Sequence, residues 1–122
     1  MAEILVVDDV DDVREGIVEF LQAAGHAVAG ARDGRDAIDT LKGRRFDLVI
    51  TDIMMPEQDG TEVIMHLAGL VDRPKVLAMS GGAATVPAYM ALHLARLKAD
   101  ATLMKPFRND ELRDKVAHLL KS

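Results

Sequence analysis

Short apolar runs, rich in β-branched residues, recur along the chain and predict five strands. Most of these runs are solidly apolar rather than alternating, which is typical of strands buried on both faces of a parallel sheet. The run at 26–31 is weaker than the others. The predicted strands cover 3–7, 26–31, 47–51, 75–80 and 101–104.

Between these runs, apolar residues recur at three- and four-residue intervals, the spacing that predicts amphipathic helices. In the first such segment, Val13, Ile17 and Leu21 fall on one face. A segment of this kind follows every strand. The predicted helices cover 12–25, 34–42, 61–70, 86–99 and 109–122.

Residues at the segment boundaries predict how two of these helices begin and end. Asp11 or Asp12 could cap the start of the first helix, because aspartate favours that position. Gly25 suits its C-terminal end, where glycine is the preferred residue. Asn109 is the predicted N-cap of the last helix.

Strict alternation of strand and helix predicts the α/β class. Right-handed crossovers would then build a parallel sheet with helices on both faces. With 122 residues, the chain can form one domain with a sizeable core but not two ordinary ones. Repeats, linkers and low-complexity segments are absent from the sequence, so we expect residues 1–122 to form a single domain without an effector domain.

Composition and charge exclude several classes of protein. An apolar fraction of 49% argues against a disordered chain. The 15 Lys and Arg residues against 20 Asp and Glu give a net charge of −5, and without a basic run direct nucleic-acid binding is not expected. There is no cysteine for disulfides or thiolate metal sites. Because no stretch has the length of a membrane span and no signal peptide is recognisable, we expect a cytoplasmic protein.

Polar side chains follow four of the five predicted strands. Asp8 and Asp9 follow the first, Asp52 the third, Ser80 ends the fourth and Lys105 follows the fifth. In an open α/β sheet, ligands bind outside the carboxyl ends of the strands, near the point where strand order reverses. We therefore expect these five residues to meet at one edge of the sheet.

The residue types in this group are suited to phosphoryl transfer. Three converging carboxylates repel one another unless a cation lies among them, and oxygen ligands favour Mg²⁺. Lys105 could hold a phosphoryl oxygen as a point charge, and Ser80 could donate a hydrogen bond to another. The carboxylate of Asp52 could attack phosphorus and become an acyl phosphate.

Four stretches, in this order and spacing, closely resemble the receiver domain of two-component response regulators. They are ILVVDD, DLVITDIMMPEQDG, VLAMSG and LMKPF. The resemblance covers essentially the whole chain. It implies a flavodoxin-like, doubly wound (βα)5 fold with strand order 2-1-3-4-5.

The resemblance also assigns the acidic residues. Asp52 matches the phosphorylated aspartate, and Asp8 and Asp9 match the acidic pair that organises Mg²⁺, for which Mn²⁺ can substitute. Met54 would offer its backbone carbonyl to the same ion. A domain of this kind phosphorylates and dephosphorylates itself and is not a turnover enzyme.

On the other side of the site, Ser80 matches the switch residue that moves to bond the phosphoryl group, and Lys105 matches the lysine that binds it. Pro106 matches a proline preceded by a cis peptide bond. The implied phosphodonor is a histidine kinase or a histidine phosphotransfer protein. Output would reach a downstream protein through the Ser80 loop and the face formed by 86–99, 101–104 and 109–122, and a phosphorylation-dependent homodimer stays open.

The sequence departs from the family pattern three residues before Lys105. Family members commonly place an aromatic switch there, whereas this chain has Thr102. Tyr89, in the predicted fourth helix, is the only tyrosine and a conceivable substitute.

Three other functions compete with this reading. In a phosphohydrolase of the haloacid-dehalogenase type, Asp9 would be the nucleophile and Asp11 the general acid, but Asp52 would then have no role. A serine hydrolase at Ser80 lacks the first glycine of the nucleophile elbow. A degenerate receiver that only binds partners would not need all the acidic residues and Lys105.

Overall fold

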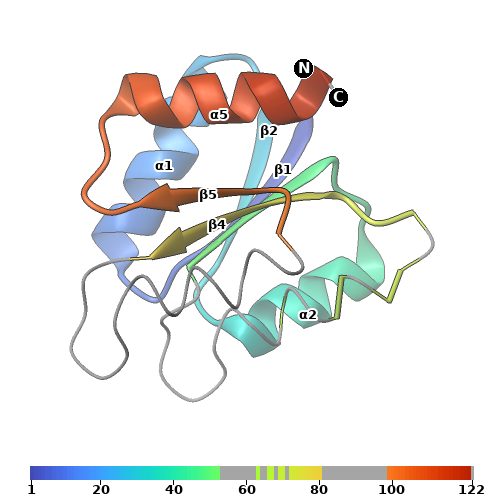
Figure 1. Cartoon of the computed structure of the whole chain (residues 1–122). Coiled ribbons are helices and arrows are strands. Elements are labelled where there is room, and N and C mark those ends of the chain that lie inside the picture. Colours follow the sequence, from blue (N-terminus) through green and yellow to red (C-terminus); the bar gives the residue numbers. More distant parts are fainter. Residues whose placement is uncertain (53–62, 64–65, 68, 71, 81–98, 122) are drawn as a thin grey trace.

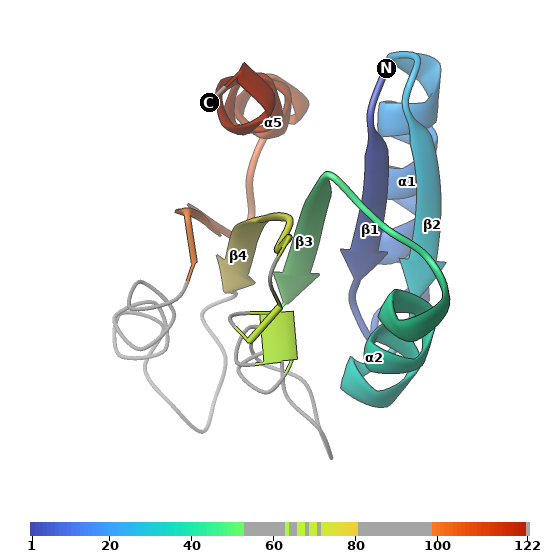
Figure 2. The ribbon, with the colours of Figure 1, turned by 90° about the vertical axis from the view of Figure 1, so that its right-hand side faces the viewer.

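In the computed structural model, described over residues 1–52, 63, 66–67, 69–70, 72–80 and 99–121, five parallel strands form one sheet in the order β2-β1-β3-β4-β5. Figure 1 shows α5 and α2 on opposite sides of this sheet, and Figure 2 shows β4, β3, β1 and β2 running side by side in one direction. The strands are β1 (Glu3–Val7), β2 (Ala27–Ala31), β3 (Leu48–Asp52), β4 (Lys75–Ser80) and β5 (Ala101–Met104). The complete helices of the described part are α1 (Asp11–Ala23), α2 (Gly34–Gly43) and α5 (Asn109–Lys121).

The predicted α/β class and strand order are confirmed, and every strand lies within one residue of its predicted bounds. Of the helix predicted over 61–70, five residues are described: Val63, His66 and Leu67 are helical, whereas Gly69 and Leu70 are not. The helix predicted over 86–99 falls outside the described residues except for Ala99, which is not helical. No helix in the described part is long and apolar enough to cross a membrane.

Two hydrophobic cores, one on each face of the sheet, explain why the strands are solidly apolar. In β1, Ile4 and Val6 belong to the core under α1 and α5, whereas Leu5 and Val7 belong to the core on the α2 side. Successive side chains of a strand point to opposite faces, so covering both faces requires apolar residues at every position. The buried helical residues of these cores are Ile17, Leu21, Leu112, Val116 and Leu119 on the first face, and Ala37, Val63 and Leu67 on the second.

The predicted N-caps of two helices were wrong by one or two residues. Helix α1 begins at Asp11 and its N-cap is Val10, which makes no side-chain cap. Asp11 and Asp12 therefore lie in the first turn, where carboxylates stabilise the positive end of the helix dipole. Asn109 is the first residue of α5 rather than its N-cap. The backbone N–H of the preceding Arg108 donates to the Glu111 carboxylate at 3.1 Å, so Glu111 binds a backbone group at this helix start.

The end of α1 follows the prediction for Gly25. This residue has a φ of 99°, in the left-handed region that favours glycine. Its N–H donates to the carbonyl of Gln22 at 3.0 Å, and the N–H of His26 donates to that of Leu21 at 3.2 Å. This pair of bonds is the Schellman motif, which satisfies the last carbonyls of the helix.

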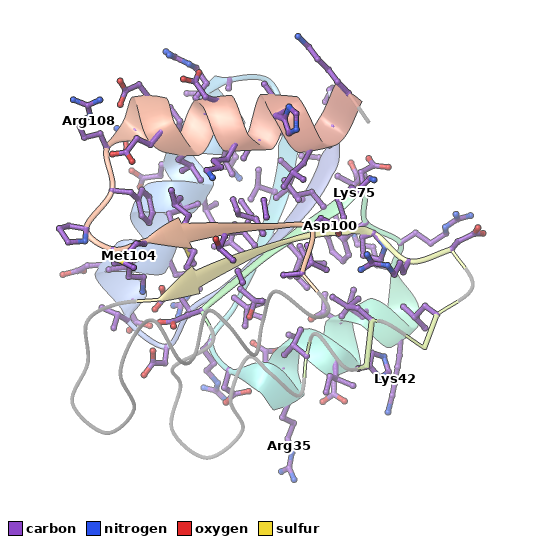
Figure 3. The ribbon with its side chains drawn as sticks, in the orientation of Figure 1. Arg35, Lys42, Lys75, Asp100, Met104 and Arg108 are labelled. Carbon is purple, nitrogen blue, oxygen red and sulfur yellow. The ribbon has the colours of Figure 1, made fainter. Side chains whose placement is uncertain are left out.

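At the edge where the strands begin, two aspartates bind the backbone of the neighbouring strand. The carboxylate of Asp47 accepts from the N–H of Glu3 at 2.8 Å, and that of Asp100 accepts from the N–H of Val76 at 2.8 Å. Asp47 and Asp100 also donate their own N–H groups to the carbonyls of the same two residues. Figure 3 shows Asp100 at this edge and Met104 at the opposite one. These bonds extend the ladders β1–β3 and β4–β5 by one residue each.

Replacing Asp100 by Ala should lower the free energy of unfolding by about 1 to 2 kcal/mol, because the N–H of the buried Val76 loses its acceptor. Asp100→Asn keeps an acceptor oxygen and should lose less. Arg73→Met removes the ion pair between Arg73 and Asp100, which spans 2.9 Å between partly exposed side chains, but keeps the Asp100 carboxylate, and should cost about 0.5 kcal/mol. Urea denaturation measures all three variants. Equal losses for Asp100→Ala and Arg73→Met would contradict this role of the carboxylate.

Candidate functional site

The register of the central strands brings the acidic residues together. Val7 of β1 is paired with Thr51 of β3. Asp8 follows Val7 and Asp52 follows Thr51, so the two aspartates are the next pair along these strands. β1 also pairs with β2 on its other edge, so strand order reverses here. This is the point where open α/β sheets bind their ligands.

Lys105 reaches the same point from the end of β5, the last strand in the sheet order. Ser80, the last residue of β4, is paired with Met104, the last residue of β5. Lys105 follows Met104 directly, and the peptide bond between Lys105 and Pro106 is cis, as the family resemblance implies. Four strands thus end with their polar residues at one edge, as predicted from the sequence.

Three carboxylates form a compact group at this edge. One oxygen from each of Asp8, Asp9 and Asp52 lies within 4.8 Å of the others. Asp8 is fully buried and Asp52 is 5% exposed, whereas Asp9 is exposed. Aspartate is rarely buried without a partner, because removing its charge from water is costly.

The ammonium of Lys105 bridges the two buried carboxylates. Its Nζ donates to Asp8 Oδ2 at 2.6 Å and to Asp52 Oδ2 at 2.9 Å. Only 19% of the Lys105 side chain is exposed. These are short, charge-assisted hydrogen bonds in a poorly hydrated place, which strengthens them.

The pKa of Lys105 reflects two opposing effects. Burial of the ammonium acts to lower the pKa, since desolvation disfavours the charged form. Hydrogen bonds from Asp8 and Asp52, and their negative charges, act in the opposite direction and prevail. The pKa of Lys105 is therefore raised above the ordinary 10.5, so the side chain is a permanent cation in this group at neutral pH.

Asp8 is held by bonds on all sides. Its N–H donates to the carbonyl of Ala31 at 3.1 Å, and its Oδ1 accepts from the N–H of Val10 at 2.9 Å. With Oδ2 on Lys105, both carboxylate oxygens have a donor. The buried carboxylate thus has a fixed orientation toward the edge of the sheet.

The charge of this group matches a divalent cation. Three carboxylates and one ammonium leave two negative charges within a few ångströms. The donors are all oxygens, with no His or Cys in the group, and this set suits Mg²⁺ rather than Zn²⁺. Asp8, Asp9 and Asp52 are the described residues that would hold such an ion.

The remaining predicted site residues are described only in part. Ser80 lies at the end of β4, and its backbone alone is described; Met54 and Tyr89 fall outside the described residues. Thr102 is partly buried in β5 and alternates with Ala101 and Leu103, which pack on the α1 and α5 side. The side chain of Thr102 therefore faces the opposite side of the sheet.

Arg14 is a residue of this edge that the sequence did not indicate. Its Nη1 donates to the backbone carbonyl of Asp8 at 3.0 Å, and its Nη2 pairs with Asp11 Oδ1 at 2.6 Å. An arginine five residues past the acidic pair, on an amphipathic helix, would be interpreted as an exposed charge. Its role depends on a bond back to the strand end, for which the sequence carries no distinct signal.

The comparisons with known proteins agree on one family. A family model described as the response regulator receiver domain matches residues 4–117. The MprA response regulators of Mycolicibacterium vanbaalenii and Mycobacterium tuberculosis are each 36% identical to this chain over 118 residues, which are 97% of the chain and 50% of the relative. The chain spans about half the length of the curated relatives it matches.

Solved structures give the same result. The response regulator protein TrrA of Thermotoga maritima, solved in complex with Mg²⁺-BeF, is 33% identical with a TM-score of 0.85 and covers 98% of this chain and 99% of its own. The Francisella response regulator 1452 receiver domain is 26% identical with a TM-score of 0.85, over 99% and 98% of the two chains. The flavodoxin-like strand order thus recurs across these relatives.

Substituting Lys105 by Met keeps an apolar stem but leaves the buried carboxylate of Asp8 without its cation. The free energy of unfolding at pH 7 should fall by about 2 to 3 kcal/mol. Because the pKa of Lys105 is raised on folding, the unfolded chain loses this proton first as the pH rises. The advantage of the wild type over Lys105→Met should therefore be full below about pH 10 and shrink at higher pH.

Chemical denaturation across this pH range measures the difference between the two proteins. Lys75→Met, at the opposite edge of the same sheet (Figure 3), is the matched control and should stay within about 0.5 kcal/mol of the wild type. An unchanged stability of Lys105→Met at pH 7 would mean that the bridge contributes nothing to folding.

Proposed function

This chain belongs to the response regulator receiver family, and from that premise we propose that it accepts a phosphoryl group on Asp52 from a phosphohistidine. The reaction depends on Mg²⁺ at the same edge, with Mn²⁺ as a substitute. The donor is a histidine kinase or a histidine phosphotransfer protein. The chain is then a signalling domain that modifies itself rather than a turnover enzyme.

The two kinds of charge beside Asp52 support this proposal most strongly. Asp8 and Asp9, at the end of β1, lie close to it as oxygen ligands for a cation. Lys105 is bonded both to Asp52 itself and to Asp8. A phosphoryl group on Asp52 would lie beside this ammonium and, with the cation bound, beside a second positive charge, and phosphoryl transfer needs chiefly such positioning and charge neutralisation.

The chemical step is a displacement at phosphorus. A carboxylate oxygen of Asp52 forms the new O–P bond, the P–N bond of the phosphohistidine breaks, and its electron pair returns to the imidazole. A bound Mg²⁺ would supply the positive charge that the two unneutralised carboxylates of the site require. Lys105, now held by two carboxylates, would shift one of its hydrogen bonds to a phosphoryl oxygen.

The surface beside the site is shaped to admit a phosphodonor protein. A cleft of about 640 Å³ lies between α1 and the start of α5, and Lys105 is part of its wall. Val10 follows Asp9 and Met104 precedes Lys105 in the sequence, and both side chains are about half exposed, at 48% and 51%. The other residues of the cleft are Asp12, Val13, Gly16, Ile17, Pro106, Phe107 and Asn109. An apolar surface next to the acceptor would let a helical donor place its histidine over Asp52.

Phosphorylation would be passed on by residues that the family resemblance singled out. Ser80 would move toward the phosphoryl group, Met54 would lend its carbonyl to the metal, and Thr102 would take the place of the usual aromatic switch. The downstream partner is a protein, with a phosphorylation-dependent homodimer as one arrangement. Direct nucleic-acid binding and membrane binding are not part of the proposal. A cytoplasmic location and a single domain over 1–122 stay predictions.

Acetyl phosphate with Mg²⁺ should add one phosphoryl group to the wild-type chain and none to Asp52→Asn. Intact-mass spectrometry measures the gain, and borohydride trapping followed by peptide mapping locates it. Asp110→Asn, which changes an exposed carboxylate of the first turn of α5, is the control and should be labelled like the wild type. Omitting Mg²⁺ should abolish labelling in both.

The mapped residue separates the competing functions. Label on Asp9 would overturn the proposal and favour a haloacid-dehalogenase-type phosphohydrolase, for which no comparison gives support. No label on the wild type would favour a receiver that only binds partners.

A further inference from the structure

Arg14 lies across the strand ends with most of its side chain covered. Only 16% of the side chain is exposed, although Asp11, its ion-pair partner, is 74% exposed. An ion pair with so exposed a partner contributes little by itself. The covered position of Arg14 therefore points to its other contact, the bond from Nη1 to the backbone carbonyl of Asp8.

Gly30 of β2 leaves the space that Arg14 occupies. A Cβ atom at position 30 would lie 3.2 Å from Arg14 Cδ, 3.4 Å from Cγ and 3.5 Å from Nε. A side chain there would have to displace the arginine stem. β2 supplies no polar group to the carboxylate cluster, yet it determines whether Arg14 can reach Asp8.

The carbonyl that Arg14 binds belongs to the peptide plane joining Asp8 to Asp9. This plane is rigid, so a bond to its oxygen restrains the positions of the two α-carbons that carry the carboxylates. A charge-assisted bond from a guanidinium is stronger than one between neutral groups. The opposite end of the Asp8 residue is already fixed by its bond to Ala31.

We propose that Arg14 is a positioning residue for the metal-binding pair Asp8 and Asp9, and that Gly30 is the gap it requires. The inference rests on the proposed Mg²⁺ site. Residues behind metal ligands commonly change metal affinity by 10-fold or more when they are replaced. Asp11 pairs with the charge of Arg14 at 2.6 Å. Replacing Arg14 should therefore act on the site mainly by changing the positions of Asp8 and Asp9.

Titration calorimetry with Mg²⁺ on the purified chain tests this proposal. Arg14→Met should weaken Mg²⁺ binding roughly 10-fold. Gly30→Val, which suits a strand but fills the gap, should weaken it by a similar factor. The double variant should be no weaker than either single one, because both changes remove the same contact. Arg14→Lys keeps the charge but has no fork to reach Asp8 and Asp11 together, so it should restore only part of the affinity.

Arg73→Met is the matched control, since it removes an arginine from an ion pair at the opposite edge. It should change stability slightly and Mg²⁺ affinity not at all. In metal-free protein, the NMR amide signals of Asp8 and Asp9 should shift in Arg14→Met and Gly30→Val but not in Arg73→Met.

Each failure has a distinct signature. If the wild type binds no Mg²⁺, the proposed metal site is wrong. If the wild type binds Mg²⁺ and Arg14→Met and Gly30→Val bind it equally well, the positioning role of Arg14 is wrong while the site stands. Tighter binding by Arg14→Met, with Arg14→Lys unchanged, would show that Arg14 acts through its charge and would also overturn the inference. If Arg14→Met fails to fold, Gly30→Val and Arg14→Lys still decide.

Discussion

The ammonium of Lys105, shared by two buried carboxylates, is the interaction on which the edge of this sheet depends. Asp8 has no exposed surface and Asp52 almost none, and burying two such carboxylates without a bonded cation would be strongly destabilising. Lys105 supplies it at 2.6 Å and 2.9 Å. The bridge joins the ends of β1, β3 and β5, strands that lie far apart in the chain.

The bridge in turn requires the two-sided packing of the sheet. Parallel strands all end on the same side of the molecule, and strong apolar cores on both faces keep them in register. A slip of one residue between β1 and β3 would turn core side chains toward the wrong face of the sheet. It would also separate Asp8 from Asp52. The stability of the cores and the geometry of the site therefore have a common cause.

The sequence was most informative where one physical requirement dominates. Burial on both faces demands apolar residues throughout, so the strands could be predicted to within one residue. Polar residues at strand ends predicted the meeting of Asp8, Asp52 and Lys105. The helix starts were less predictable, because Asp11 can serve as a cap or as a first-turn charge, and the chain alone does not choose.

Two side-chain contacts at the site could not be predicted. The bond from Arg14 to the carbonyl of Asp8 depends on the register of β2, which places Gly30 beneath the arginine stem. The bridging position of Lys105 was also unforeseen, since the sequence indicated only that it would hold a phosphoryl oxygen. In both cases the partner is set by tertiary geometry rather than by local pattern.

The two edges of the sheet differ in how easily their carboxylates could exchange partners. Asp47 and Asp100 are bound to main-chain N–H groups, which cannot withdraw without pulling a strand out of the sheet. Lys105 ends in a flexible four-carbon stem, and its tip can turn toward another anion while the backbone stays in place. An exchange of partners by Lys105 would therefore leave the strands in place, whereas an exchange by Asp47 or Asp100 would disrupt the sheet.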